Sequence, residues 1–219
     1  MPSEATLEAY EKVAHGYRRK VWPIVTSFLE SVRGKVVIDI GCGKGLAGSF
    51  WVRRGVYVGI DLSPSMLFTA PEGLRGSPFF WAIAGEAETL PLRDGVADSA
   101  LMIAVLHHIR GREERVRALR EVKRSLRRGG RVLITVWSGL QYPILLEVLK
   151  AVFKGLSDGF RGFWRCSKSG CRYYHLYTLR ELVNEVEEAG LEVLEAGTYV
   201  APGKGRGRKN YFVVALNPG

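Results

Sequence analysis

The sequence of 219 residues has few cysteines, few side-chain amides and no long hydrophobic run. Its three cysteines, Cys42, Cys166 and Cys171, are too few for the disulfide framework of a small secreted domain. No stretch approaches the roughly 18 consecutive apolar residues of a membrane-spanning helix, and the first residues are acidic where a secretory signal is basic. We therefore expect a cytoplasmic protein that does not bind membranes.

The small number of side-chain amides indicates the kind of organism that the protein comes from. Gln141 is the single glutamine and there are three asparagines, whereas arginine is abundant, a composition that suggests a thermophile. An intracellular Cys166–Cys171 disulfide is more probable in such an organism than in a mesophile. Cys166, Cys171 and His175 do not have a standard zinc spacing. We expect unlinked thiols, with a disulfide and a metal site as alternatives.

Short apolar runs alternate with amphipathic stretches along most of the chain, and 47% of the residues are hydrophobic, which excludes a disordered or collagen-like chain. The runs are continuous and rich in β-branched or aromatic residues, as in strands buried on both faces. They cover 35–40, 56–60, 79–83, 99–104 and 131–136. Residues 46–54, 64–70 and 112–128 have helical character, so the sequence predicts an α/β fold with a parallel sheet and right-handed crossovers.

The ends of the chain add to this core. Residues 4–33 predict two helices that meet at Trp22-Pro23. Residues 139–176 predict an insertion after the fifth strand, with one helix from Pro143 to Lys154 followed by a stretch rich in glycine and aromatic residues. A helix over 179–189, closed by a glycine, and an antiparallel strand pair, 193–199 and 211–216, complete the prediction.

A glycine-rich turn follows the first strand in the sequence Asp39-Ile40-Gly41-Cys42-Gly43-Lys44-Gly45. Glycines there let the backbone approach a ligand closely. The spacing matches neither a dinucleotide fingerprint nor a phosphate-binding loop. The second strand ends at Asp61, where a carboxylate accepts hydrogen bonds from ribose hydroxyls.

These motifs, with Gly85-Glu86-Ala87-Glu88-Thr89-Leu90-Pro91-Leu92 and Ala104-Val105-Leu106-His107-His108-Ile109, resemble the class I S-adenosylmethionine-dependent methyltransferases over residues 35–137. The resemblance implies a Rossmann-like fold with a mostly parallel seven-stranded sheet, a final antiparallel strand and helices on both faces. It implies one methyltransferase domain over 1–219, divided into N-terminal helices (1–33), a cofactor-binding core (35–137), the insertion and a C-terminal part (178–219). The cofactor-binding residues that it implies are Asp39, Gly41, Gly43, Gly45, Asp61, Leu62, Met66, Glu86, Ala87 and Ala104.

Further segments resemble one branch of these enzymes, the tRNA wobble-uridine carboxymethyl methyltransferases. They are Tyr10-Glu11-Lys12-Val13-Ala14, Trp22-Pro23, 103–109, 115–121, 129–137 and Arg172-Tyr173-Tyr174-His175-Leu176-Tyr177. This resemblance implies esterification of 5-carboxymethyluridine in tRNA. Related enzymes work with a small zinc-binding activator protein that covers an apolar sheet edge, and an exposed apolar fifth strand would suit such a partner.

A carboxylate is already a nucleophile at neutral pH, so the enzyme mainly has to align it with an activated methyl group. A cationic or hydrogen-bonding group that orients the carboxylate suffices, and our catalytic candidates are His108, Arg172 and Tyr174. One histidine of the pair His107-His108, and at least one tyrosine of Tyr173-Tyr174, can instead be core residues. Trp137 is equally suited to cover the core or to stack on a base.

The net charge of +10 is concentrated in two places. Between Arg110 and Arg131 there are ten basic and three acidic residues, and the glycine-rich segment 203–209 has four basic residues and no acid. The first cluster has the usual alternative of a solvated helix surface. A flexible basic loop suits a phosphate backbone, so we expect RNA, the tRNA anticodon arm, rather than DNA. The RNA-binding candidates are Arg18, Arg19, Lys204, Arg206, Arg208 and Lys209.

Two other functions stay open. The protein could instead be a small-molecule methyltransferase of the same fold. The basic segments would then be an ordinary surface feature of a thermophilic protein. A non-catalytic scaffold that binds S-adenosylmethionine is the third hypothesis, and the intact Asp39, Asp61 and glycine turn argue against it.

Overall fold

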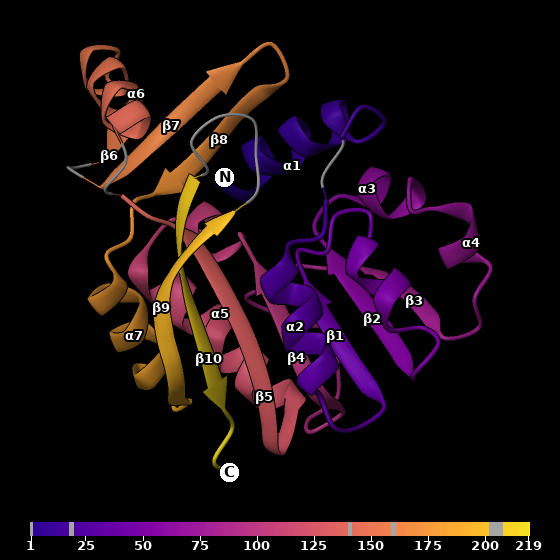
Figure 1. Cartoon of the computed structure of the whole chain (residues 1–219). Helices are drawn as coiled ribbons and strands as arrows, with labels where there is room; N and C mark the ends of the chain where they lie inside the picture. Colours follow the sequence, from indigo (N-terminus) through magenta and orange to yellow (C-terminus); the bar gives the residue numbers. More distant parts are fainter. Residues whose placement is uncertain (1, 18–19, 140–141, 159–160, 202–207) are drawn as a thin grey trace.

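The computed structural model describes residues 2–17, 20–139, 142–158, 161–201 and 208–219 (Figure 1). Its main sheet has seven strands in the order β3-β2-β1-β4-β5-β10-β9, and β10 alone runs antiparallel to both of its neighbours. The predicted α/β sheet with a final antiparallel strand is confirmed. The strands are β1 (Val36–Ile40), β2 (Val56–Asp61), β3 (Phe80–Ala84), β4 (Ala97–Ile103), β5 (Leu126–Trp137), β9 (Glu192–Ala201) and β10 (Arg208–Leu216).

Helices cover both faces of the sheet (Figure 1). On one face lie α2 (Pro23–Ser31) and the short 3-10 helix η1 (Leu46–Phe50); on the other lie α5 (Arg112–Ser125) and α7 (Leu179–Glu188). Alternate residues of the central strands serve the two cores: Val37 packs with α2, and Ile38 packs with α5. This two-sided burial explains why the strand sequences are apolar runs instead of alternating ones.

Several predicted helices differ in length from the observed ones. The first, α1 (Pro2–Val13), ends well before Trp22, whereas α2 begins at Pro23 as expected. The helix predicted over 46–54 is only the 3-10 turn η1, and short helices α3 (Pro64–Phe68) and α4 (Glu72–Arg75) precede β3. None of the helices in the described part of the chain is long and apolar enough to cross a membrane.

The insertion after β5 contains a second, three-stranded sheet. Helix α6 (Tyr142–Phe153) agrees with the prediction, but the following aromatic stretch forms β6 (Ser157–Asp158), β7 (Gly162–Ser167) and β8 (Gly170–His175). Cys166 and Cys171 are opposite each other on β7 and β8 and form a disulfide, so the expectation of unlinked thiols is wrong. The hairpin register places the two side chains together, which their spacing in the sequence did not specify.

The fifth strand is not the exposed apolar edge that was expected. β5 lies between β4 and β10, and Leu133, Ile134 and Val136 on it are fully buried. The two edges of the sheet are β3 and β9, and both carry exposed apolar residues. On the β3 side they are aromatic: Trp81 is 59% exposed and Phe79, just before the strand, is 49% exposed.

Candidate active site

The glycine turn after β1 has a backbone that other residues cannot adopt without strain. Gly41, Gly43 and Gly45 have φ angles of 67°, 57° and 67°. A Cβ atom on Gly41 would lie 2.2 Å from the Cγ2 atom of Val105. The amides of Gly41 and Cys42 both donate to the carbonyl of Ile60, which holds the turn across the ends of β1 and β2.

Asp61, the last residue of β2, completes this turn. Its carboxylate accepts hydrogen bonds from the backbone amides of Gly43, at 2.7 Å, and Ser63, at 2.9 Å. Burial raises the pKa of Asp61 above its ordinary value, and the two amide donors oppose that rise. The side chain therefore fixes the glycine turn while it also faces the cavity beside it.

A cavity of about 660 Å³ opens over the ends of β1, β2 and β4, a size typical of small-molecule sites. Its wall includes eight of the ten residues predicted to bind the cofactor: Gly41, Gly43, Asp61, Leu62, Met66, Glu86, Ala87 and Ala104. The other two, Gly45 and Asp39, lie in or beside the turn and are not part of this wall. A Cβ atom on Gly45 would lie 2.9 Å from the ring of Phe80, and the carboxylate of Asp39 accepts a hydrogen bond from the hydroxyl of Tyr57.

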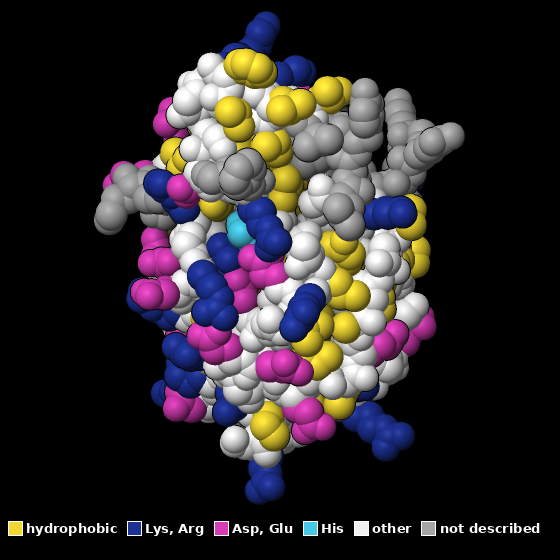
Figure 2. Space-filling model, turned by 90° about the vertical axis from the view of Figure 1, so that its left-hand side faces the viewer, with side chains coloured by type: hydrophobic (Ala, Val, Ile, Leu, Met, Phe, Trp, Pro, Cys, Tyr) yellow, Lys and Arg dark blue, Asp and Glu magenta, His cyan; other side chains and the backbone are white. Residues whose placement is uncertain are grey.

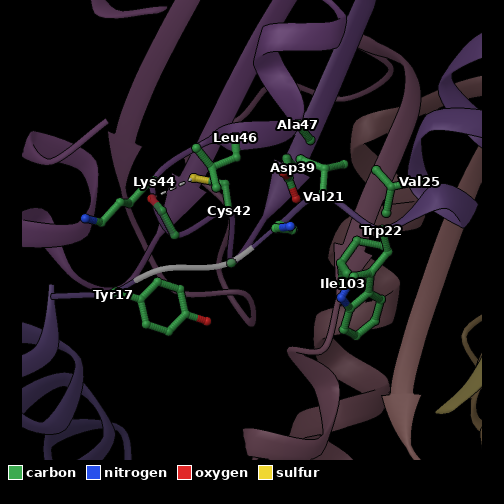
Figure 3. Close-up of a pocket in the computed structure, with 13 residues that line it drawn as sticks. Tyr17, Val21, Trp22, Val25, Asp39, Cys42, Lys44, Leu46, Ala47 and Ile103 are labelled. Atoms are coloured by element: carbon green, nitrogen blue, oxygen red, sulfur yellow. Dashed lines mark hydrogen bonds between the residues drawn. The ribbon is translucent and has the colours of Figure 1, made fainter. Parts of the chain in front are cut away.

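Asp39 faces a separate and smaller cavity of about 80 Å³ behind the glycine turn (Figure 3). Tyr17 and Lys44 lie on one side of it, and Trp22 with Val25 on the other (Figure 3). Tyr17 lines both cavities.

The N-terminal helix α1 forms a wall of the large cavity that the sequence did not reveal. Thr6 and Tyr10, one helical turn apart, line it. The carboxylate of Glu11 accepts hydrogen bonds from the hydroxyls of Ser63 and Ser65 and from the amide of Ser65, at 3.1 Å. These bonds hold α1 against the start of α3, more than 50 residues away in sequence, so local patterns contain no signal for them.

The two adjacent histidines have different environments. His107 is fully buried, and its ring lies 5.3 Å from that of Trp137. His108 lines the large cavity; its Nε2 atom is 3.1 Å from the hydroxyl of Tyr10 and its Nδ1 atom is 2.8 Å from the carbonyl oxygen of Tyr173. The structure thus makes His107 a core residue and leaves His108 as the candidate for contact with a substrate.

Tyr174 lies behind His108 and is not part of the cavity wall. Its side chain is 3% exposed, and its ring is 4.7 Å from that of His108 and 4.9 Å from that of Trp137. Tyr173 is equally buried, so both tyrosines pack the insertion against the core. Trp137 belongs to the same aromatic cluster and covers the end of β5.

Arg172 of β8 lies beside Tyr10. Its guanidinium carbon is 5.4 Å from the centre of the Tyr10 ring. Burial acts to lower the pKa of Arg172, but the hydroxyls of Tyr174 and Tyr10 raise it overall. The Nε atom of this side chain is buried and has no hydrogen-bond partner among the described residues. A buried charged donor of this kind normally has a partner, and an anionic ligand would supply one.

Most arginines around α5 form ion pairs within the protein. Arg115 and Glu185, both almost fully buried, join α5 to α7 at 2.6 Å. Other pairs are Arg110–Asp158, Arg112–Glu188, Arg124–Asp94, Arg124–Glu121 and Arg127–Asp98. The face that carries α7 shows acidic and basic side chains intermixed (Figure 2). This cluster is therefore largely neutralised inside the molecule.

The RNA-binding candidates fall mostly outside the described residues. Arg18, Arg19, Lys204 and Arg206 lie there, Arg208 is described only by its backbone in β10, and Lys209 is exposed. The residues next to both basic segments do meet: the ring of Trp22 lies 6.1 Å from that of Tyr199.

Comparisons with known proteins agree with this architecture. Residues 38–134 match the family described as a methyltransferase domain. The structure resembles a crystal structure of a Methanosarcina mazei S-adenosylmethionine-dependent methyltransferase, with a TM-score of 0.75, 19% identity, and coverage of 90% of this chain and 98% of that one. It also resembles the methyltransferase in a complex with the Trm112 methyltransferase activator of Haloferax volcanii, with a TM-score of 0.65, 15% identity, and coverage of 100% of this chain and 97% of that one.

The sequence relatives indicate a narrower family than the structural neighbours do. The tRNA (carboxymethyluridine(34)-5-O)-methyltransferase of Schizosaccharomyces pombe is 30% identical over 97% of this chain and 96% of its own length. A protein of Encephalitozoon cuniculi named as a methyltransferase is 32% identical over 83% of this chain and 82% of its own length. The Macaca fascicularis enzyme of the same name as the yeast one is 36% identical over 63% of this chain, which spans 20% of that longer protein. The chain therefore belongs to the S-adenosylmethionine-dependent methyltransferases, in the family that contains the tRNA carboxymethyluridine methyltransferases.

Proposed function

We propose that this methyltransferase acts on tRNA and esterifies the carboxymethyl group of 5-carboxymethyluridine at the wobble position. The observation that carries the proposal is the buried Nε donor of Arg172, which has no partner among the described residues. The guanidinium lies over the ring of Tyr10, which lines the cavity with His108, although Arg172 itself is not part of the cavity wall. A guanidinium selects an anionic acceptor. Among the known relatives, the yeast enzyme that this chain covers almost completely acts on carboxymethyluridine by its name.

The residues of the large cavity fit S-adenosylmethionine. Asp61 would hold the ribose hydroxyls, and Leu62 with Met66 would contact the faces of adenine. Glu86 and Ala87 would meet the adenine edge, and the backbone of Gly41, Gly43 and Ala104 would take the methionine portion. Asp39 and Gly45 would act indirectly, because they shape the turn.

S-adenosylmethionine, when bound, supplies a methyl group already activated on a sulfonium. A carboxylate oxygen of the acceptor would take that methyl group, with the electron pair of the sulfur–methyl bond left on sulfur. No proton is transferred, so the site needs no general base. The protein has to hold the carboxylate in line, for which we assign Arg172 and His108, while Tyr174 supports the ring of His108.

For the RNA, we assign the two basic segments that flank the Trp22–Tyr199 contact: Arg18 and Arg19 on one side, and Lys204, Arg206, Arg208 and Lys209 on the other. Phosphate contacts there would position the anticodon arm, while the cavity receives the splayed wobble base. The arginines around α5 contribute less, because so many of them are already paired with acids.

A small zinc-binding activator is the second proposed partner, and β3 is the edge that we assign to it. Trp81 of β3 and Phe79 just before it are exposed, and Phe68 at the end of α3 is 76% exposed. An edge strand offers free backbone groups to a partner strand, and exposed aromatic side chains add apolar contact area. The Haloferax volcanii neighbour is in a complex with the Trm112 methyltransferase activator.

The experiment is transfer of tritium from methyl-labelled S-adenosylmethionine to bulk tRNA, followed by nucleoside digestion. We expect label in one modified uridine, with more label when the activator is present. Label in no nucleoside, with or without the activator, contradicts the proposal and favours a small-molecule substrate. If Asp61→Ala abolishes cofactor binding but leaves the cellular phenotype unchanged, the protein is a scaffold.

A further inference from the structure

His108 is hydrogen-bonded at both ring nitrogens, and the partners determine which nitrogen carries the proton. The carbonyl oxygen of Tyr173, 2.8 Å from Nδ1, can only accept, so Nδ1 carries the hydrogen. In the neutral ring Nε2 is then an acceptor, and the hydroxyl of Tyr10, 3.1 Å away, donates to it. The two contacts come from β8 and α1, on opposite sides of the ring.

The same tyrosine also contacts Arg172. The guanidinium lies over the ring of Tyr10, with its central carbon 5.4 Å from the ring centre. The hydroxyl of Tyr10 thus bonds to His108 while its ring packs against Arg172. One tyrosine joins the two side chains that we assign to the acceptor.

Tyr10 itself is held firmly. The next residue, Glu11, is bonded to Ser63 and Ser65, and α1 packs along β8, where Gly170 leaves room for Ala9: a Cβ atom on Gly170 would lie 3.1 Å from the Cβ of Ala9. The rings of Tyr17 and His108 both approach Tyr10 edge-on, at 6.4 and 6.0 Å.

We propose that Tyr10 is a positioning residue of the methyl-transfer site. Its hydroxyl donates to Nε2 of the His108 ring, whose Nδ1–H is held by the carbonyl of Tyr173, and its ring keeps the Arg172 side chain in place, so that the Nε donor of Arg172 is left for the substrate. In this arrangement the lone pair of His108 Nε2 is already used, so Arg172 supplies the hydrogen bond to the carboxylate and His108 holds the acceptor by contact with its ring. The inference rests on the proposed function for the identity of that carboxylate, but its geometry does not require a substrate.

The first test is the nitrogen-15 NMR spectrum of the histidine rings in the intact protein. There are four histidines, and His108→Asn identifies the signals of the ring in question. We expect His108 to show a protonated Nδ1 and an unprotonated Nε2, and Tyr10→Phe to move the Nε2 signal while those of His15 and His175 stay in place. An Nε2-protonated neutral ring in the wild type overturns the inference, even if the variant fails to fold.

The second test is the kinetics of Tyr10→Phe, which removes only the hydroxyl. Because one hydrogen-bonded link is lost, we expect kcat to fall about tenfold while KM for S-adenosylmethionine changes less than about twofold. Tyr211→Phe is the matched control, since Tyr211 lies on β10 and packs in the main core of the sheet. An unchanged kcat with an active wild type contradicts the role of Tyr10; an inactive wild type contradicts the proposed function instead.

Discussion

At the scale of single residues, the sequence located the glycine turn and Asp61 but not the residues that α1 contributes to the cavity. Gly41, Gly43 and Asp61 could be predicted because a turn between strand and helix restricts its own sequence locally. Tyr10 could not, because its partner His108 lies 98 residues away and only packing of α1 brings them together. Of the two adjacent histidines, the sequence favoured His108 for contact with a substrate, and the structure shows that His107 is the fully buried one.

Arg172 provides the first prediction at this scale. Arg172→Met removes the charged donor, and a hydrogen bond to a charged group contributes about 1.5–3 kcal/mol, so kcat/KM for tRNA should fall about 10- to 100-fold. Arg172→Lys keeps the positive charge but lacks the planar set of N–H donors of the guanidinium, so it should recover only part of the lost kcat/KM. Calorimetric affinity for S-adenosylmethionine should stay within about twofold. Equal activity of the Met and wild-type proteins would exclude a carboxylate contact.

At the scale of elements, continuous apolar runs identified the strands β1 to β5, but the insertion hairpin escaped because its aromatic residues come in adjacent pairs, Phe163-Trp164 and Tyr173-Tyr174, among polar residues and glycines, without the alternation typical of a strand. The disulfide at its tip gives a prediction. Closing a loop of six residues, from Cys166 to Cys171, stabilises a fold by about 2 kcal/mol in the chain-entropy estimate. Cys166→Ser with Cys171→Ser should lower the free energy of unfolding by that amount in urea titrations. An unchanged midpoint would show that the disulfide does not stabilise the hairpin.

Helix α7 gives a prediction on pH dependence. Glu181 caps its first turn together with Thr178 and also pairs with His175, 2.7 Å away. Burial acts to raise the pKa of Glu181, but His175 and Arg161 lower it overall from 4.5. A lowered pKa in the folded state means stability that is present above pH 4.5 and lost as the pH falls through the folded-state value. Glu181→Gln should therefore lose stability at pH 7 and show a smaller decline between pH 5 and 3 than wild type does. Parallel curves would contradict this.

At the scale of the whole molecule, the net charge of +10 did not by itself show which basic residues are already paired with acids. The sequence located the basic residues around α5, but their acidic partners come from α7 and from the loop before β4. This distribution could not be derived from counts, because pairing depends on the tertiary fold.

That distribution predicts which charges set the salt dependence of tRNA binding. Neutralising Lys204, Arg206, Arg208 and Lys209 together should weaken binding and reduce the slope of log K against log salt by up to about 3, since each phosphate contact contributes about 0.7–0.9. The control removes equal charge from four exposed arginines elsewhere: Arg33, Arg53, Arg120 and Arg128. Equal slopes for the two variants would show that the β9–β10 connection does not touch RNA.

The exposed β3 edge gives a further prediction for the assembly. Trp81→Lys places a charge on the edge strand and should abolish co-purification with the activator, while Val200→Lys, on the opposite edge strand β9, should not. Retained binding by Trp81→Lys would locate the activator elsewhere on the surface.

The central claim, methylation of a carboxylate held by Arg172, is tested most directly with three anticodon stem-loops that differ only at the wobble base. One bears 5-carboxymethyluridine, one its carbamoylmethyl amide and one plain uridine. Incubation with labelled S-adenosylmethionine and the activator should label only the acid, and mild alkali should release that label as methanol, because an ester is saponified. Alkali-stable label, or label in the amide or in plain uridine, would contradict the account.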